Sequence, residues 1–160
     1  MKTLITGAAG FIGSQLAHRL WQNGENLVLI DNFSFGREDN LVFEDHDFRN
    51  EVQRIDIRDK AKIKLILSNG DIDYIYNIAG IAPLPDCQLN PTEAIDVNLN
   101  GFVNLLENAR LYGVKKIIQA STNAIYENET NFPTTESSNT PLAHLSQHEV
   151  CSRVVCPVIL

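Results

Sequence analysis

The stretch TGAAGFIG at residues 6–13 constrains the fold more than any other part of the sequence. The apolar run KTLIT at 2–6 precedes it, and apolar residues at helical spacing follow it. Glycines at 7, 10 and 13 let the backbone turn sharply from a buried strand into a helix, and Gly13 lets that helix pack close to the sheet. Free N–H groups and the positive end of the helix dipole then face one point, which suits a phosphate group.

The rest of the chain alternates apolar runs of strand length with segments of helical period. Further strands are expected at 26–30, 52–56, 73–80 and 115–121. Helices are expected from Ile12 to about Asn23, with Gly24 ending the helix, and over 92–112. Another helix is expected to begin after an N-cap at Asp59 and to run to about Ser68. The last helix carries Ala94, Val97, Gly101, Leu105 and Ala109 on one side. Segment 32–50 is expected to be loop with at most one short helix, and 81–91, which contains three prolines, to be loop. This alternation is typical of an α/β doubly wound parallel sheet (Rossmann-type) of about five strands, in the order 3-2-1-4-5.

Composition limits the partners of the chain. Its 160 residues carry a net charge of −7, which argues against nucleic acid or an anionic membrane surface, since both need a basic face. Cys87, Cys151 and Cys156 are odd in number and lack CxxC spacing, so free thiols in a reducing cytoplasm are expected. No apolar run has the length of a signal-peptide core or a membrane span. A single cytoplasmic unit without membrane or nucleic-acid partner is the expectation.

Asp31 follows the second expected strand. A carboxylate there can accept hydrogen bonds from both hydroxyls of an adenosine ribose and would repel a 2′-phosphate, so the sequence predicts a dinucleotide site that favours NAD over NADP. Arg37 could shield such a phosphate, which leaves NADP open. An α/β domain without any dinucleotide is the remaining alternative.

Further motifs occur along residues 1–141: DNFSFG at 31–36, DIRD at 56–59, NIAGIA at 77–82, NLNGFVNLLENAR at 98–110 and ASTNAIY at 120–126. Together with TGAAGFIG they resemble the extended short-chain dehydrogenase/reductase family, specifically its NAD-dependent nucleotide-sugar epimerases and dehydratases. The resemblance implies contacts of Asp56 and Ile57 with adenine and of Asn98 near the nicotinamide. The cofactor-binding residues that it implies are Gly7, Gly10, Phe11, Ile12, Gly13, Asp31, Asn32, Asp56, Ile57, Ala79, Gly80 and Asn98.

In the family that the chain resembles, a tyrosine assisted by a lysine takes a proton from a sugar hydroxyl while NAD accepts the hydride. Thr122 then corresponds to the hydroxyl that hydrogen-bonds the reacting oxygen. Asn123 and Ala124 stand where some dehydratases carry Asp-Glu, and neither can act as a general acid. This difference favours epimerase, reductase or decarboxylase chemistry over 4,6-dehydration. A nucleotide-sugar is the implied substrate, and family members often pair, which leaves a homodimer open.

The resemblance places the tyrosine at Leu145 and the lysine at Glu149. Leucine has no proton to exchange, and glutamate would raise rather than lower a tyrosine pKa. One explanation is a substitute base among His144, His148 and Glu149; the two histidines lack a clear third ligand, so no metal site is expected. A second is an inactive NAD-binding relative.

A shift of the reading frame near residue 141 is the preferred explanation. With suitable codons, Leu145-Ser146 read one nucleotide on gives tyrosine, and Glu149-Val150 gives lysine. We therefore expect an NAD-binding Rossmann-type domain at 1–141 and an aberrant or truncated tail at 142–160 in place of the catalytic helix, with the substrate lobe missing. The predicted function is that of an NAD-dependent epimerase/dehydratase-type oxidoreductase acting on nucleotide-sugars, epimerase-like and inactive in this form. The alternative is a non-catalytic NAD-binding or regulatory module.

Overall fold

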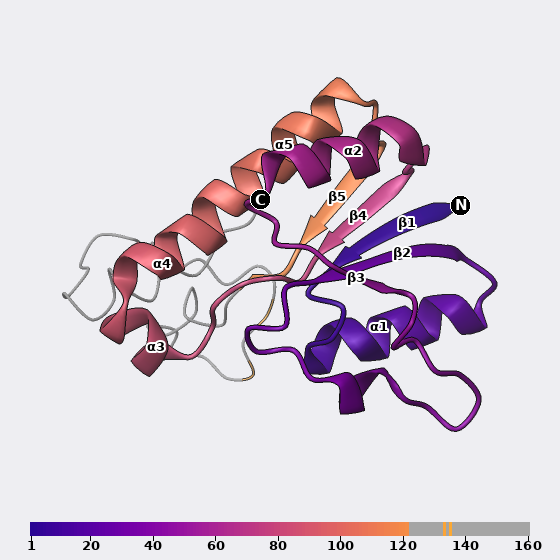
Figure 1. The fold of residues 1–160 in the computed structure, drawn as a ribbon, viewed down its shortest axis with the longest axis horizontal. Coiled ribbons are helices and arrows are strands. Elements are labelled where there is room, and N and C mark those ends of the chain that lie inside the picture. Colours follow the sequence, from indigo (N-terminus) through magenta and orange to yellow (C-terminus); the bar gives the residue numbers. More distant parts are fainter. Residues whose placement is uncertain (122–132, 134, 136–160) are drawn as a thin grey trace.

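The computed structural model describes residues 1–121, 133 and 135 (Figure 1). A five-stranded sheet forms its centre, and every pair of neighbouring strands is parallel. The strands are β1 (Lys2–Thr6), β2 (Asn26–Asp31), β3 (Val52–Arg54), β4 (Tyr74–Asn77) and β5 (Lys116–Gln119). Their order, β3-β2-β1-β4-β5, confirms the prediction. β3 and β4 are shorter than predicted because the chain leaves the sheet after Arg54 and Asn77 to form loops at its carboxyl edge.

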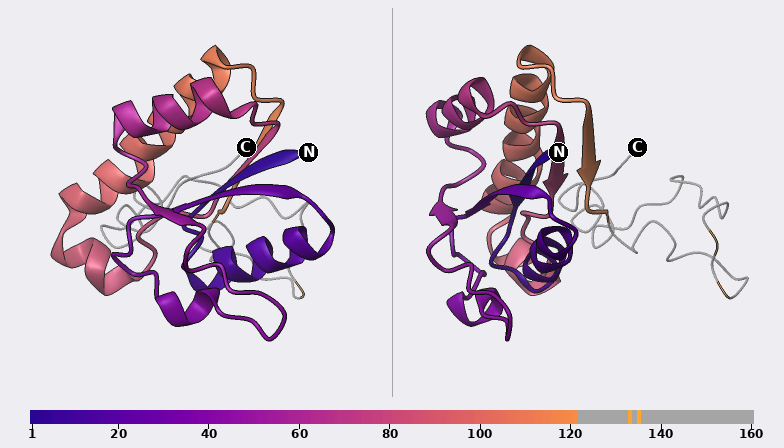
Figure 2. Two further views of the ribbon diagram at one scale, coloured as in Figure 1. Left: turned by 45° about the vertical axis from the view of Figure 1, so that its right-hand side comes forward. Right: turned by 90° about the vertical axis from the view of Figure 1, so that its right-hand side faces the viewer.

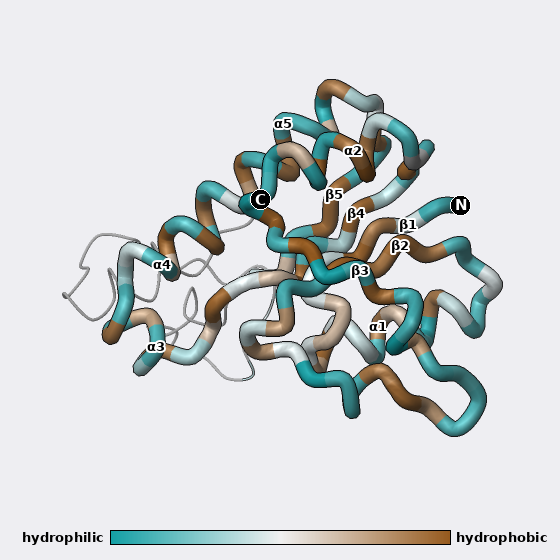
Figure 3. Tube along the Cα trace, in the orientation of Figure 1, coloured by the Kyte–Doolittle hydropathy of each residue, from teal (hydrophilic) through white to brown (hydrophobic). Residues whose placement is uncertain are grey.

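Two apolar layers cover the two faces of the sheet. Alternate residues of a strand point to opposite faces, so Leu4 packs in one core cluster and its neighbour Ile5 in the other. The Ile5 cluster includes residues of helix α1 (Phe11–Gln22), while the Leu4 cluster includes residues of α2 (Lys60–Gly70) and α5 (Phe102–Leu111). Figure 2 shows the helices on either side of the sheet, and Figure 3 shows the apolar segments gathered along the strands.

The ends of two helices agree with the sequence pattern. After α1, Gly24 has φ 77° and its N–H donates to the carbonyl of Trp21, so it ends the helix as predicted. At the start of α2, the Asp59 side chain accepts a hydrogen bond from the Lys62 N–H at 3.0 Å, which confirms the predicted cap. α2 continues two residues beyond the predicted Ser68.

The predicted helix over 92–112 is three consecutive segments: α4 (Pro91–Ile95), the π-helical η2 (Asp96–Gly101) and α5. Its predicted apolar stripe is buried. From Val97 to Ala109 the stripe advances in steps of four residues, and each such step overshoots a turn of regular α-helix by about 40°. The wider turns of η2 take up part of this excess and keep the stripe on the sheet.

The prediction of loop over 81–91 holds at 81–83 and 90 and is wrong at 84–89 and 91, where helices form. Residues Leu84–Leu89 form the short helix α3, with Pro85 in its first turn. The missing N–H of a proline costs nothing at that position, so prolines that would break a helix interior are compatible with a helix start. The one short helix allowed in 32–50 is the 3₁₀ segment η1 (Glu38–Leu41).

Within the described part of the chain, no helix combines the length and the apolar character needed to cross a membrane. Thr122, Leu145, Glu149 and the predicted boundary after residue 141 lie outside the described residues.

Phe48 should be a major contributor to stability. Its side chain is fully buried beside α1, whereas Phe11 is 79% exposed. We expect Phe48→Ala to lower the free energy of unfolding by about 3–5 kcal/mol, because it removes buried apolar surface and leaves a cavity. Phe11→Ala is the matched control and should change it by no more than about 0.5 kcal/mol. Urea denaturation followed by circular dichroism measures both, and equal losses would contradict this assignment of the core.

Candidate functional site

A groove of about 280 Å³ opens at the carboxyl edge of the sheet, above the ends of β1, β2, β3 and β4. β1 lies between β2 and β4, so the chain reverses its direction of winding at this edge, where ligands of doubly wound sheets bind. All the predicted cofactor residues except Gly13 and Asn98 line the groove. The lining consists of Gly7, Gly10, Phe11, Ile12, Ile30, Asp31, Asn32, Ser34, Phe35, Gly36, Ile55, Asp56, Ile57, Ile78, Ala79, Gly80, Ile81 and Val97.

The three glycines of the turn have different structural roles. Gly7 has φ 69°, and a Cβ there would lie 2.7 Å from the backbone N of Ala79. A Cβ on Gly13 would lie 2.0 Å from the carbonyl oxygen of Gly7. The expected close packing of Gly13 is thus against the turn itself, directly after β1. Gly10 has an extended backbone, and its Cβ would meet only the Gly7 carbonyl oxygen, at 3.2 Å. The fold excludes side chains at Gly7 and Gly13, whereas a side chain at Gly10 would enter the groove.

The first turn of α1 presents unsatisfied donors to the groove. Gly10 has no side chain to cap the helix, and the first intrahelical bond runs from the Ser14 N–H to the Gly10 carbonyl at 3.0 Å. The N–H groups of Phe11, Ile12 and Gly13 precede that bond and have no acceptor within the helix. No acidic residue lies in this first turn to offset the helix dipole. These features suit an anion such as a pyrophosphate.

Asp31 ties the turn to the loop that follows β2. Its Oδ2 accepts a hydrogen bond from the Ala9 N–H at 2.9 Å, and its Oδ1 accepts one from the Phe33 N–H at 2.7 Å. Each oxygen retains capacity for a further donor from the groove. Gly36 is required beside it, because a Cβ there would lie 2.8 Å from Oδ1.

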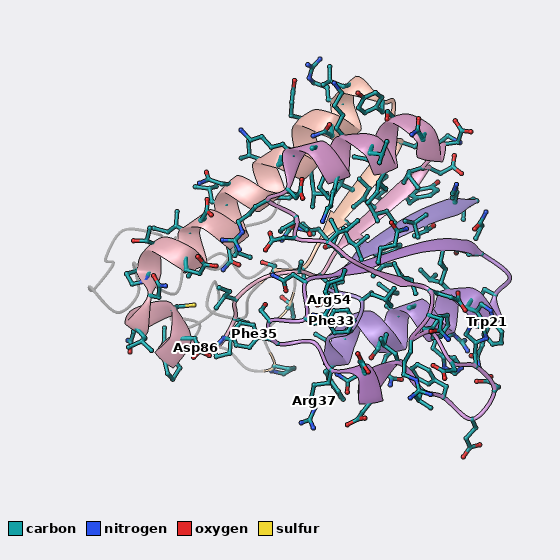
Figure 4. All side chains as sticks on the ribbon, in the orientation of Figure 1. Trp21, Phe33, Phe35, Arg37, Arg54 and Asp86 are labelled. Atoms are coloured by element: carbon teal, nitrogen blue, oxygen red, sulfur yellow. The ribbon has the colours of Figure 1, made fainter. Side chains whose placement is uncertain are left out.

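Arg37 does not line the groove. Its exposed guanidinium lies 3.7 Å from the carboxylate of Asp39, and Figure 4 shows its side chain directed outward. Arg37 is therefore not placed to neutralise a 2′-phosphate beside Asp31.

At the far wall of the groove, a donor and an acceptor stand on adjacent residues. The Arg58 guanidinium, then the Arg58 backbone N–H and the amide of Asn32, hold the pKa of Asp56 at about 2, so this carboxylate only accepts hydrogen bonds. The next residue, Ile57, is 4% exposed, and among the described residues its backbone N–H has no hydrogen-bond partner. Because Ile57 lines the groove, this N–H can donate to an acceptor atom of a ligand there.

Asn98 does not line the groove, but its side chain holds the loop after β4, which does. Its Oδ1 accepts from the Ile81 N–H at 2.7 Å and its Nδ2 donates to the Ile81 carbonyl at 2.9 Å. A Cβ on Gly80 would approach Asn98 Oδ1 to 3.1 Å, so the loop after β4 lies directly on this side chain. The resemblance implies that Asn98 lies near the nicotinamide, which stays a prediction; in the structure its amide hydrogen-bonds the loop backbone.

Two buried polar residues that the sequence analysis missed fix the end of β4. The Thr6 hydroxyl hydrogen-bonds Asn77 Oδ1 and accepts from the Ala79 N–H at 3.2 Å. Both side chains are buried at the ends of apolar strands, where a polar residue needs a partner. Polar residues closing apolar strands were the available signal. In the described residues, no group of three or more His, Cys, Asp or Glu side chains is arranged for a metal ion.

Three features together define a Rossmann-type dinucleotide-binding domain: a parallel sheet, an amide-lined turn at the first helix, and a carboxylate at the end of the second strand. More specifically, the chain belongs to the NAD-dependent epimerase/dehydratase family, whose model matches residues 3–155. This confirms the family resemblance, and with it NAD as the cofactor of the family.

Individual relatives show the same relationship. The chain is 36% identical to the UDP-glucose 4-epimerase of Mycolicibacterium smegmatis over 85% of its length, which covers 44% of that protein. It is 31% identical to UDP-glucuronic acid decarboxylase 4 of Arabidopsis thaliana, over 86% of this chain and 29% of the relative. It superposes on the Thermus thermophilus UDP-glucose 4-epimerase complex with NAD with a TM-score of 0.71 and 31% identity, over 89% of this chain and 43% of that one. The chain thus spans less than half the length of these relatives.

Asp56 should give a pH-dependent contribution to stability. Because its folded pKa of about 2 lies below the ordinary 3.8, the contribution is complete above the ordinary value and is lost as the pH falls through about 2. We expect Asp56→Asn to be less stable than wild type at neutral pH, with the difference shrinking as the pH approaches 2. Urea denaturation across this range measures it, with Asp39→Asn as an exposed control. A difference that is independent of pH would contradict the assignment.

Proposed function

We propose that this chain binds NAD as the cofactor-binding portion of an epimerase-like oxidoreductase acting on nucleotide-sugars, and that in this form it does not convert the sugar. The observation that carries the proposal is the turn at residues 7–13, where uncapped helix N–H groups face a groove and glycines keep side chains out of the way. Backbone donors there can hold two phosphate groups without any cation from the groove lining.

The residues of the groove match the parts of NAD in order. The N–H groups of the first turn of α1 would hold the pyrophosphate, and Asp31 would accept from the adenosine ribose hydroxyls. Asp56 and Ile57 would then meet adenine, with the carboxylate accepting from its amino group and the N–H donating to its ring N1. Ala79 would lie along the part of the groove leading toward the nicotinamide. When bound, NAD supplies a hydride acceptor.

The substrate class is inferred from relatives. The two curated relatives are named for UDP-glucose and UDP-glucuronic acid. Asn123 and Ala124 cannot act as general acids, so we favour an epimerase-like reaction over dehydration. Since the chain covers 44% and 29% of these relatives, the sugar itself is left open within the class.

NAD binding should depend on the size of residue 10. The extended backbone of Gly10 accepts any residue, so Gly10→Ala and Gly10→Val should fold while their side chains fill the groove. We expect the dissociation constant for NAD to rise with side-chain size, by about tenfold or more for valine, which corresponds to about 1.4 kcal/mol or more of binding free energy. Isothermal titration calorimetry measures affinity, and thermal unfolding is the control for folding. Wild type that fails to bind NAD at millimolar concentration would overturn the proposed function.

Turnover separates the proposed inactive form from an active enzyme. Leu145 and Glu149 stand where the family resemblance places the tyrosine and lysine, so neither the proton acceptor nor its neighbouring cation is present. We expect the chain with NAD to leave UDP-glucose unchanged by NMR and to generate no NADH absorbance. Conversion of the sugar would contradict inactivity and indicate a substitute base such as His144 or His148. A purely regulatory NAD-binding module would give the same null result, so turnover distinguishes an active enzyme from both inactive alternatives.

A further inference from the structure

Arg58 lies at the centre of an ion-pair cluster behind the groove. Its Nη2 lies 2.8 Å from Asp56 Oδ2, and its Nη1 lies 2.8 Å from Glu93 Oε1 and 3.1 Å from Asp96 Oδ2. The Arg58 side chain is 28% exposed. Partial burial makes such contacts stronger than those of an exposed pair, because water screens them less. Arg58 does not line the groove, yet it contacts a residue that does.

One side of Arg58 fixes the Asp56 carboxylate completely. Oδ1 accepts from the Arg58 backbone N–H (2.8 Å) and Nε (2.9 Å), while Oδ2 accepts from Arg58 Nη2 and from Asn32 Nδ2 (2.9 Å). Three of these four donors belong to Arg58. The fourth, Asn32, lines the groove, so its place on Oδ2 is the one that a donor from a ligand in the groove would take. The two parallel bonds from Nε and Nη2 are the planar fork that only arginine offers, so the plane of the carboxylate is determined by this side chain.

The second terminal nitrogen of Arg58, Nη1, connects the loop that carries Asp56 to the helical stretch formed by α4, η2 and α5. Glu93 belongs to α4 and Asp96 to η2, and the Asp96 Oδ1 also accepts from Asn100 Nδ2 at 2.9 Å. The same stretch holds Ile57, because Asn104 Nδ2 donates to its carbonyl at 2.8 Å. Both Asp56 and Ile57 are therefore held against one helical support, and their acceptor and donor keep a fixed relation.

We propose that Arg58 is a positioning residue that sets base specificity: it orients the ionised Asp56 carboxylate beside the Ile57 N–H so that the pair accepts adenine and rejects hypoxanthine. This inference rests on the proposed binding of NAD. Adenine presents an amino donor next to a ring acceptor, N1, which complements an acceptor beside a donor. Hypoxanthine presents a carbonyl and an N1–H, so both contacts would be reversed. The carbonyl would face a carboxylate, and the Ile57 N–H would face another donor.

The test compares two dinucleotides that differ only in this edge of the base. Calorimetry would measure the dissociation constants of NAD and of nicotinamide hypoxanthine dinucleotide for wild type and for Arg58→Lys, which keeps the charge and loses the fork. Wild type should prefer NAD by about tenfold to a hundredfold, the range that two directed hydrogen bonds to a base edge give. In Arg58→Lys this ratio should fall by about fivefold or more, because the carboxylate is no longer held in one plane.

Two further variants make the result specific. Arg54→Gln removes a nearby guanidinium that lies over the Phe33 ring at 4.3 Å (Figure 4), outside the groove lining, and it should keep the wild-type ratio. Glu93→Gln weakens the ion pair between Arg58 and α4 and leaves the contacts of Arg58 with Asp56 in place, so it should lower the ratio slightly. It also serves as the test if Arg58→Lys fails to fold, and an unchanged ratio would then overturn the inference.

The outcomes distinguish a failure of the proposed NAD binding from a failure of the proposed role of Arg58. Absence of NAD binding in wild type would overturn the proposed function together with this inference. Wild type that binds both dinucleotides equally, or an Arg58→Lys ratio equal to that of wild type, would overturn the role of Arg58 and leave NAD binding intact. A loss of affinity that is equal for both ligands would show that Arg58 supports the fold alone, and would also overturn its role in specificity.

Discussion

The contact between Gly13 and the carbonyl of Gly7 is the constraint on which the site depends. Only the absence of a Cβ lets the helix start so close to the strand that precedes it. This closeness aims the uncapped first turn of α1 at the groove, and it leaves Gly7 at a positive φ against Ala79 of the neighbouring loop. Close approaches between backbone segments thus set the spacing of the helix, the turn and the loop after β4.

The groove handles charge in two different ways. Among the residues that the structure describes, its lining includes two carboxylates, Asp31 and Asp56, and no lysine or arginine. At the turn, backbone amides and the helix dipole replace a cation, which suits an anion held at close range. At the far wall a true cation, Arg58, stands behind the carboxylate and keeps it ionised without entering the groove. A ligand that is anionic at its centre and a hydrogen-bond donor at its end matches this pattern.

Local rules explain which parts of the fold could be predicted from the sequence. The turn at residues 7–13, the cap by Asp59 and the glycine after α1 depend on neighbours within a few residues, and the strand order follows from right-handed crossovers. The helix α3 was missed because prolines signal a break unless their position in the helix is known. The positions of Asn98 and Arg58 depend on the register of η2 against loops far away in sequence, which no local pattern specifies. The sequence also could not indicate that Asn98 would bind the loop backbone.

The exposed side chains of Phe11 and Ile12 have a consequence for how such a site can drift in evolution. Both residues contribute a backbone N–H to the groove, and every amino acid other than proline has one. Phosphate binding therefore places little constraint on which side chains they carry. The glycines beside them have no such freedom. Substitutions at positions 11 and 12 should therefore leave phosphate binding intact as long as the spacing of the glycines is kept.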